Sequence, residues 1–140
     1  MERKKVIALR GRANVGKSQT IKEVYGLLRS KYQCGVEWEK NTRTDVRAVL
    51  IIDGVRIGIE SQGDPRGRLA DSLSLFARIG CRVIVCATRT RGGTVDAVNN
   101  LRPNYEPVWL DQVVKPNASQ QEASNDATAR RIVRDVEGAF

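Results

Sequence analysis

Residues 11–18 read Gly11-Arg12-Ala13-Asn14-Val15-Gly16-Lys17-Ser18, and the predicted architecture is built outward from them. They match the phosphate-binding pattern G-x-x-x-x-G-K-[ST] at every fixed position. The apolar run Val6–Leu9 before them predicts a buried strand, and Ile21, Val24 and Leu28 after them have helical spacing. Strand, glycine loop and helix in this order form the context that the motif requires.

The spacing of this loop implies its chemistry. Gly11 and Gly16 let the backbone curl so that successive amides point into one concavity, where the positive end of the next helix also attracts anions. Lys17 is placed to reach the β- and γ-phosphates of a nucleotide, and Ser18 offers a hydroxyl to Mg²⁺. We expect the nucleotide to contact Gly11, Arg12, Ala13, Asn14, Val15, Gly16, Lys17, Ser18 and the adjoining Gln19.

Composition narrows the classes of protein that are possible. The chain has 140 residues, of which 41% are hydrophobic, and this predicts a single domain over 1–140 with no membrane-spanning run. Three cysteines without metal spacing predict core thiols in a reducing cytoplasm, and the absence of histidine excludes His-based triads. The net charge of +8 is compatible with a nucleic acid, a nucleotide or an acidic protein as partner.

Apolar patterning predicts alternating strands and helices. Two β-rich runs, 46–52 and 55–60, flank Asp53-Gly54, which is a strong hairpin signal. The polar segment 36–45 predicts a loop, with a short extended piece over 36–38 as an alternative. Further elements are expected as a helix over 69–79, a strand over 82–87, a short helix over 94–101, a strand over 108–110 and a helix from Ser119. This order predicts an α/β fold with helices on both faces of a mostly parallel sheet of about five strands, including one antiparallel edge strand.

The loop over residues 11–18 resembles that of the P-loop NTPase superfamily, and its amino-acid sequence is similar to the first motif of translation-factor-like GTPases. The hairpin over 49–60 is similar to the second and third strands of small GTPases, so the resemblance covers roughly residues 6–90. It implies a three-layer P-loop NTPase-like sandwich that binds and hydrolyses ATP or GTP with Mg²⁺. It also implies a metal-binding threonine shortly before the second strand, where Thr42 and Thr44 lie.

The sequence departs from that family at two motifs. The family ends its third strand with Asp-x-x-Gly, but here the matching residues are Glu60-Ser61-Gln62-Gly63. Guanine-specific members carry Asn/Thr-Lys-x-Asp after a later strand, and nothing of that form follows 83–87 or 108–110. ATP is therefore slightly favoured over GTP.

Hairpin geometry selects the acid that serves the metal. Asp53 lies in the turn, at the edge of the sheet opposite the phosphate loop, so it is interpreted as a turn residue. The run 55–60 is parallel to the first strand and ends beside the phosphates, so Glu60 or Asp64 is expected to face Mg²⁺ together with Ser18 and Thr44. We also expect Gln62 to position an attacking water.

Two arginines follow the buried strand 82–87. Arg89 and Arg91 are expected either to stabilise charge on a γ-phosphate as arginine fingers do, or to hold an anionic second substrate. The first role belongs to a slow regulatory NTPase and the second to a small kinase with an anionic acceptor. A third alternative is a nucleotide-gated module that binds nucleic acid or protein through its basic surface.

Overall fold

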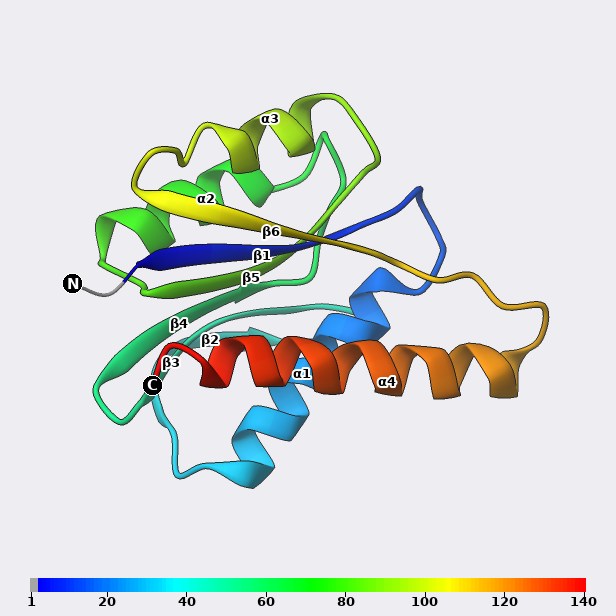
Figure 1. Cartoon of the computed structure of the whole chain (residues 1–140), viewed down its shortest axis with the longest axis horizontal. Coiled ribbons are helices and arrows are strands. Elements are labelled where there is room, and N and C mark those ends of the chain that lie inside the picture. Colours follow the sequence, from blue (N-terminus) through cyan, green and yellow to red (C-terminus); the bar gives the residue numbers. More distant parts are fainter. Residues whose placement is uncertain (1–2) are drawn as a thin grey trace.

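The computed structural model describes residues 3–140 and contains one six-stranded sheet with the order β2-β3-β4-β5-β1-β6. The strands β4, β5, β1 and β6 are parallel, and β3 pairs antiparallel with both β2 and β4. In Figure 1 the parallel strands run from left to right, so the chain leaves their carboxyl ends on the right. The elements are β1 Lys4–Arg10, α1 Lys17–Lys31, β2 Gly35–Asn41, β3 Val46–Ile52, β4 Val55–Glu60, α2 Leu69–Arg78, β5 Val83–Thr88, α3 Gly93–Asn99, β6 Tyr105–Asp111 and α4 Ala118–Glu137.

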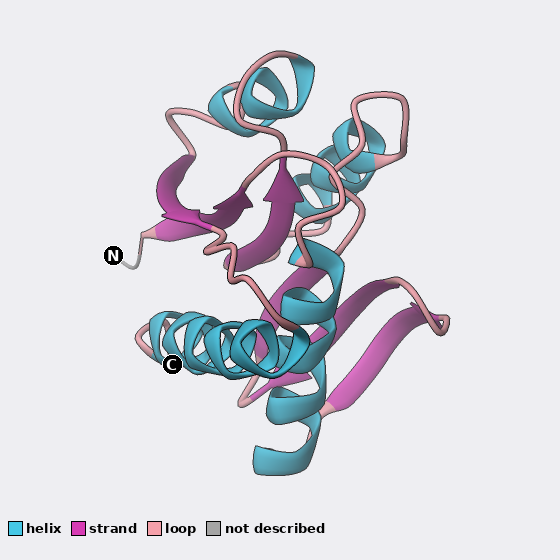
Figure 2. Cartoon of the chain, turned by 90° about the vertical axis from the view of Figure 1, so that its right-hand side faces the viewer, coloured by secondary structure: helices cyan, strands magenta, loops and turns pink. Residues whose placement is uncertain are grey.

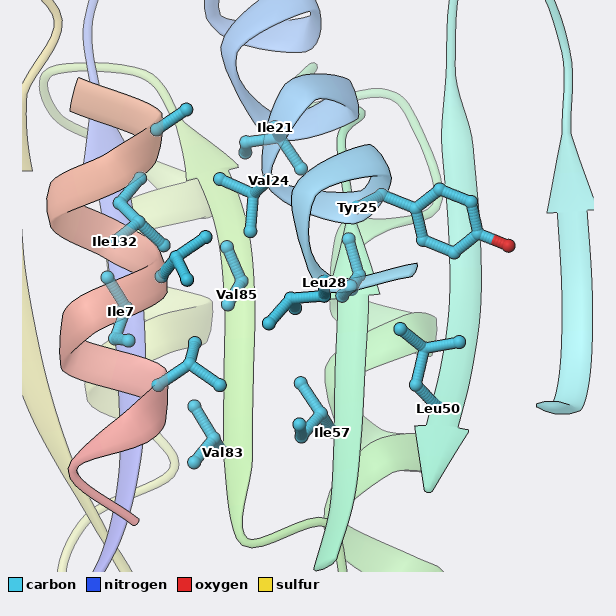
Figure 3. Packing of buried hydrophobic residues seen from close by; sticks show 14 of the residues in the cluster. Ile7, Ile21, Val24, Tyr25, Leu28, Leu50, Ile57, Val83, Val85 and Ile132 are labelled. Carbon is cyan, nitrogen blue, oxygen red and sulfur yellow. The ribbon is translucent and has the colours of Figure 1, made fainter. Parts of the chain in front are cut away.

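Helices cover both faces of the sheet, as the alternating pattern predicted. Helices α1 and α4 pack on one face, where Ile7, Ile57 and Val85 meet Val24 and other apolar side chains of the helices (Figure 3). Helices α2 and α3 cover the opposite face (Figure 1). Successive strand residues point to opposite faces, so the buried strands are apolar throughout and each face has its own core.

The hairpin between β3 and β4 is confirmed, including its turn. Asp53 and Gly54 have φ angles of 51° and 76°, as a two-residue hairpin turn with two positive φ angles requires. The register pairs Ile52 with Val55 and Arg47 with Glu60. Asp53 is thus a turn residue at the edge of the sheet away from the phosphate loop, as expected.

The loop expected over 36–45 is wrong for most of its length, because β2 is a complete strand that pairs with β3. Every residue of β2 is exposed, so its sequence lacks the apolar alternation that would reveal a strand. The sheet consequently has six strands rather than about five, and β2 rather than the antiparallel β3 forms the edge. The indole ring of Trp38 packs against Arg47 of β3, whose guanidinium lies 4.8 Å from the centre of the ring.

Helix α4 begins one residue after Asn117, whose side chain accepts a hydrogen bond from the amide of Gln120 at 2.9 Å. Asn117 is therefore the capping residue, two residues before Ser119, which the predicted capping box with Glu122 made the cap. Among residues 3–140, no helix is both long enough and apolar enough to cross a membrane.

Candidate functional site

The turn between β1 and α1 presents a row of free amides. Asn14 and Gly16 have φ angles of 61° and 91°, and these curl the chain over the first turn of α1. Within residues 3–140, none of the backbone amides of residues 12–19 donates a hydrogen bond to a protein acceptor. The start of α1 carries no acidic residue in its first turn. This arrangement offers donors and a positive helix end to an anion.

Lys17 lies at the floor of this turn with only 8% of its surface exposed. Its ammonium donates to the carbonyl oxygen of Gly11 and, at 2.6 Å, to that of Thr88 at the end of β5. Burial, and secondarily the charge of Arg89, lowers the pKa of Lys17 to about 8. The site thus holds a poorly solvated cation that would gain from a nearby anion.

A buried amide network supports the turn from below. Gln112, directly after β6, donates its side-chain amide to the carbonyl of Val15 at 2.9 Å and to Asn125 of α4 at 2.8 Å. The hydroxyl of Thr20 in turn donates to the Gln112 amide oxygen at 3.2 Å. A Cβ at Gly16 would stand 3.3 Å from the side chains of both Gln112 and Asn125, so the network closes tightly under the loop. The loop is therefore positioned by β6 and α4 as well as by its own sequence.

Ser18 meets a carboxylate that the sequence analysis did not select. Its hydroxyl lies 3.3 Å from Oδ1 of Asp45 and 3.2 Å from the carbonyl oxygen of Ser61. The Ser61 hydroxyl donates to the same Asp45 oxygen at 3.0 Å, and that of Thr44 donates to the other at 3.2 Å. Thr44, expected as a metal ligand, is thus an exposed partner of Asp45 rather than of Ser18.

Glu60 is fully buried and does not line the cavity beside Lys17. Arg68 binds both of its oxygens, at 2.8 and 3.1 Å, and the hydroxyl of Ser72 donates to it at 2.6 Å. The reason is strand alternation: Gly58 packs against Phe76 of α2, and Glu60, two residues later, points to the same face, away from α1. The expectation that Glu60 faces Mg²⁺ is corrected accordingly. In addition, β5 lies between β4 and β1, so the end of β4 is not directly beside the end of the strand that leads into the phosphate loop.

A cavity of about 390 Å³ brings several of the predicted residues together. Gln62, Asp64 and Arg89 line it together with Lys17 and Ser18. The loop 61–64 approaches β5 so closely that a Cβ at Gly63 would stand 2.8 Å from the Ala87 carbonyl. The complete lining is Ala13, Asn14, Lys17, Ser18, Asp45, Ser61, Gln62, Gly63, Asp64, Arg66, Gly67 and Arg89.

Several predicted residues do not line this cavity, namely Gly11, Arg12, Val15, Gly16, Gln19 and Arg91, besides Thr44 and Glu60. Arg91 and Gln19 are exposed and do not line it, whereas Arg12 borders a second hollow of about 540 Å³ on the other side of the turn 13–16. Val114 and Lys115, from the loop after β6, close that second hollow. The loop after β5 thus sends Arg89 toward Lys17 and Arg91 toward solvent.

The sequence analysis missed two candidate functional residues, Asp45 and Gln112, and only Asp45 had a signal in the sequence. The Asp53-Gly54 turn fixes the hairpin register, and counting back along it places Asp45 beside the end of β4. Gln112 had no such signal, because its contacts depend on how β6 and α4 pack against the loop.

The donor set suits magnesium held jointly with phosphate. In the part of the chain that the structure describes, no group of three or more acidic or cysteine side chains could hold a metal alone. Magnesium commonly binds one or two protein oxygens together with phosphate and water, and the oxygens of Ser18 and Asp45 provide such a pair. No protein-family model, curated protein or solved structure is significantly similar to this chain.

Proposed function

We propose that this chain binds a nucleoside triphosphate with Mg²⁺ and hydrolyses it slowly, with ATP slightly favoured over GTP. One observation carries the proposal: the free amides of residues 12–19 and the desolvated ammonium of Lys17 share a single turn at the start of α1. Amides and a cation in this arrangement match a polyphosphate. The corresponding architecture would be a P-loop NTPase-like three-layer sandwich.

The roles of the residues follow from their positions. Lys17 would exchange its carbonyl partners for phosphate oxygens and neutralise part of their charge. Ser18 and Asp45 would hold magnesium directly or through water, and Asp64 also lines the cavity. When bound, magnesium would supply positive charge to the phosphate oxygens.

Hydrolysis requires a water molecule aligned with the terminal phosphorus. In the proposed step the water oxygen bonds to the γ-phosphorus, the bond to the bridging oxygen breaks, and the released phosphate takes the water proton. Gln62, on the cavity wall, would orient this water through its amide. Arg89, whose charge already acts on Lys17, would oppose the charge that develops on the phosphoryl group.

The second hollow, beside the turn 13–16, is the space that we propose for the nucleoside. Val114 gives it an apolar wall, and the ammonium group of Lys115 gives it a hydrogen-bond donor. None of its lining residues is acidic, so it offers no carboxylate to the amino groups of a guanine base. Weak base selectivity is the expectation.

A small kinase is the second proposed function, favoured by one feature of the cavity. Arg66 and Arg89 both line it in addition to Lys17, so two cations besides the phosphate-loop lysine are available to hold an anionic acceptor. Transfer of the γ-phosphoryl group to an anionic acceptor would use this charge. An acceptor that speeds nucleotide consumption far above hydrolysis would favour the kinase.

The free thiols agree with a reducing compartment, and we propose the cytoplasm. Cys81 and Cys86 are buried in the core, as predicted, and Cys34 is half-buried. Burial raises the pKa of Cys81 to about 12, so this thiol is protonated and unreactive.

The deciding experiment is displacement of a fluorescent triphosphate by ATP and by GTP, with and without Mg²⁺, followed by measurement of phosphate release. Lys17→Ala should abolish or strongly weaken binding, whereas Lys40→Ala, which removes an exposed lysine of β2, should leave it unchanged. Normal triphosphate affinity in a folded Lys17→Ala variant would remove the basis of the proposal.

A further inference from the structure

Four exposed cations lie on loops at the edge of the sheet where the parallel strands end, each on a different loop. Arg12 follows β1, Arg43 follows β2, Arg91 follows β5 and Lys115 follows β6. All four strands end at the same edge of the sheet, toward which Figure 2 looks, so these loops form one surface, here called the loop edge. We propose that the loop edge binds the phosphate backbone of a nucleic acid.

The loop edge carries an excess of positive charge. Within residues 3–140, none of these four side chains forms an ion pair or a hydrogen bond. Two carboxylates near this edge, Asp45 and Asp64, bind neutral hydroxyl and amide donors and keep their charge, but the four cations outnumber them. Many cations elsewhere are paired, namely Arg3 with Glu106, Arg10 with Asp111, Arg29 with Glu39, Lys31 with Glu137, Arg56 with Glu37 and Arg130 with Asp126.

The chemistry of the loop edge fits phosphodiesters better than an acidic protein. Three of the four cations are arginines, whose planar groups bind phosphate oxygens in pairs. A protein interface would instead need a buried apolar centre with aromatic anchors. Among the residues that the structure describes, only Val113 and Val114 are large, apolar and exposed at this edge, since Val36 and Trp38 lie on β2 and Phe140 at the C-terminus.

The expected binding mode is independent of base sequence. The loops of the loop edge carry no aromatic side chain on which a base could stack. Contacts would therefore go to the backbone, and binding would depend on the release of counterions. A nucleic acid held here would cross the mouth of the cavity, where Arg66 and Arg89 add further positive charge.

The proposal goes beyond the proposed NTPase activity and is tested without nucleotide, so either can fail alone. We would measure fluorescence anisotropy of a labelled DNA duplex of about 20 base pairs while the salt concentration is varied. Four backbone contacts predict a slope of log affinity against log salt of about −3 to −4. Two unrelated sequences should bind equally, and single-stranded DNA, RNA and poly-glutamate are the comparison ligands.

The test variant is Arg43→Ser/Arg91→Ser/Lys115→Ser, which spares the phosphate loop. Its matched control, Arg78→Ser/Arg102→Ser/Arg131→Ser, removes three exposed arginines that lie outside the loop edge. The test variant should lose at least about tenfold in affinity and show a slope near −1, whereas the control should keep most of both. If the triple variant does not fold, each single substitution should reduce the slope by about one.

Three outcomes would overturn the proposal. The first is no binding of any nucleic acid at about 50 mM salt. The second is equal loss in the test and control variants, which would mean that overall charge rather than the loop edge attracts the ligand. The third is tighter binding of poly-glutamate than of DNA, which would assign the surface to an acidic protein.

Discussion

The carboxylate of Asp45 lies 3.3 Å from the hydroxyl of Ser18, although the two residues are 27 positions apart in the chain. Ser18 lies in the first turn of α1, and Asp45 directly precedes β3, so the pair joins the phosphate loop to the hairpin. The carbonyl of Ser61 approaches the same hydroxyl from the end of β4. Three segments thus converge on the oxygen that the sequence motif assigns to magnesium.

Asp45→Asn should reduce Mg²⁺-dependent turnover by roughly 10- to 100-fold, the usual range for a residue that orients or binds a metal. The amide keeps the hydrogen bonds with Ser61 but loses the negative charge that would attract the ion. The measurement is phosphate release as a function of Mg²⁺ concentration. Asp53→Asn is the control, because asparagine tolerates the positive φ angle of that turn; a larger effect at Asp53 would contradict the assignment.

Glu60→Gln should reduce stability rather than metal dependence. It removes the charge that faces Arg68 and leaves the side chain of Arg47, 3.9 Å away, without a counter-charge. Breaking such a buried pair is expected to cost about 2–4 kcal/mol in the free energy of unfolding, measured by urea denaturation. Glu37→Gln, which breaks the exposed pair with Arg56, should cost much less, because solvent screens it. If the Glu60 variant were fully stable but had lost its magnesium response, Glu60 would be a metal residue.

Glu60 and Asp45 show how much of the candidate site could be predicted from the sequence. The Asp-Gly turn sets the register of the hairpin, and the register places both Glu60 and Asp45 near the carboxyl end of β4. Alternation alone would put Asp45 on the same face as Glu60, because Arg47, two residues after Asp45, pairs with Glu60. Asp45 reaches Ser18 because it lies in the loop just before β3 rather than in the strand. The register therefore indicates the end of the sheet at which Asp45 lies, but the sequence does not indicate its contact with Ser18.

Two other features were beyond sequence reasoning for physical reasons. Strand β2 is exposed on both faces and is held by backbone pairing with β3, so no apolar period marks it. The contact of Gln112 with the carbonyl of Val15 joins residues 97 positions apart, and nothing local in either segment indicates it. Backbone pairing at an edge and a long-range amide contact leave no periodic trace.

Gln112→Leu should both destabilise the protein and weaken triphosphate binding. Leucine fills similar space but leaves the carbonyl of Val15 and one hydrogen-bond site of Asn125 without their donor. The free energy of unfolding, measured by thermal or urea unfolding, should fall by about 1–3 kcal/mol. Gln120→Ala, at an exposed position of α4, is the control. Lower stability with an unchanged dissociation constant would show that the network supports the fold without shaping the loop.

Triphosphate affinity should fall as the pH rises above about 8. The pKa of Lys17 is lowered to about 8 in the free protein, so above this pH a proton must be taken up when the phosphate binds. The loss should approach tenfold per pH unit, measured by displacement titrations between about pH 7 and pH 10. The stability of the ligand-free protein should change in the opposite direction. Because the neutral amine tolerates burial better than the ammonium, the free energy of unfolding should increase between pH 8 and 10.5. Lys17→Met should abolish this gain, and a gain that persists would assign it to another group.

Glu23→Gln should stabilise the protein at pH 8 but not at pH 4. Glu23, on α1, faces Asp126 of α4, and burial together with that neighbouring carboxylate raises its pKa to about 7, while Arg130 acts in the opposite direction. A raised pKa means that the stability present below the ordinary value of 4.5 is lost as the pH rises through 7. Removing the charge should raise the free energy of unfolding by roughly 1–2 kcal/mol at pH 8, a figure reduced because solvent screens part of the interaction. Urea unfolding at pH 4 and pH 8 measures this difference. Equal effects of the substitution at pH 4 and pH 8 would show that the two carboxyl groups do not share this interaction.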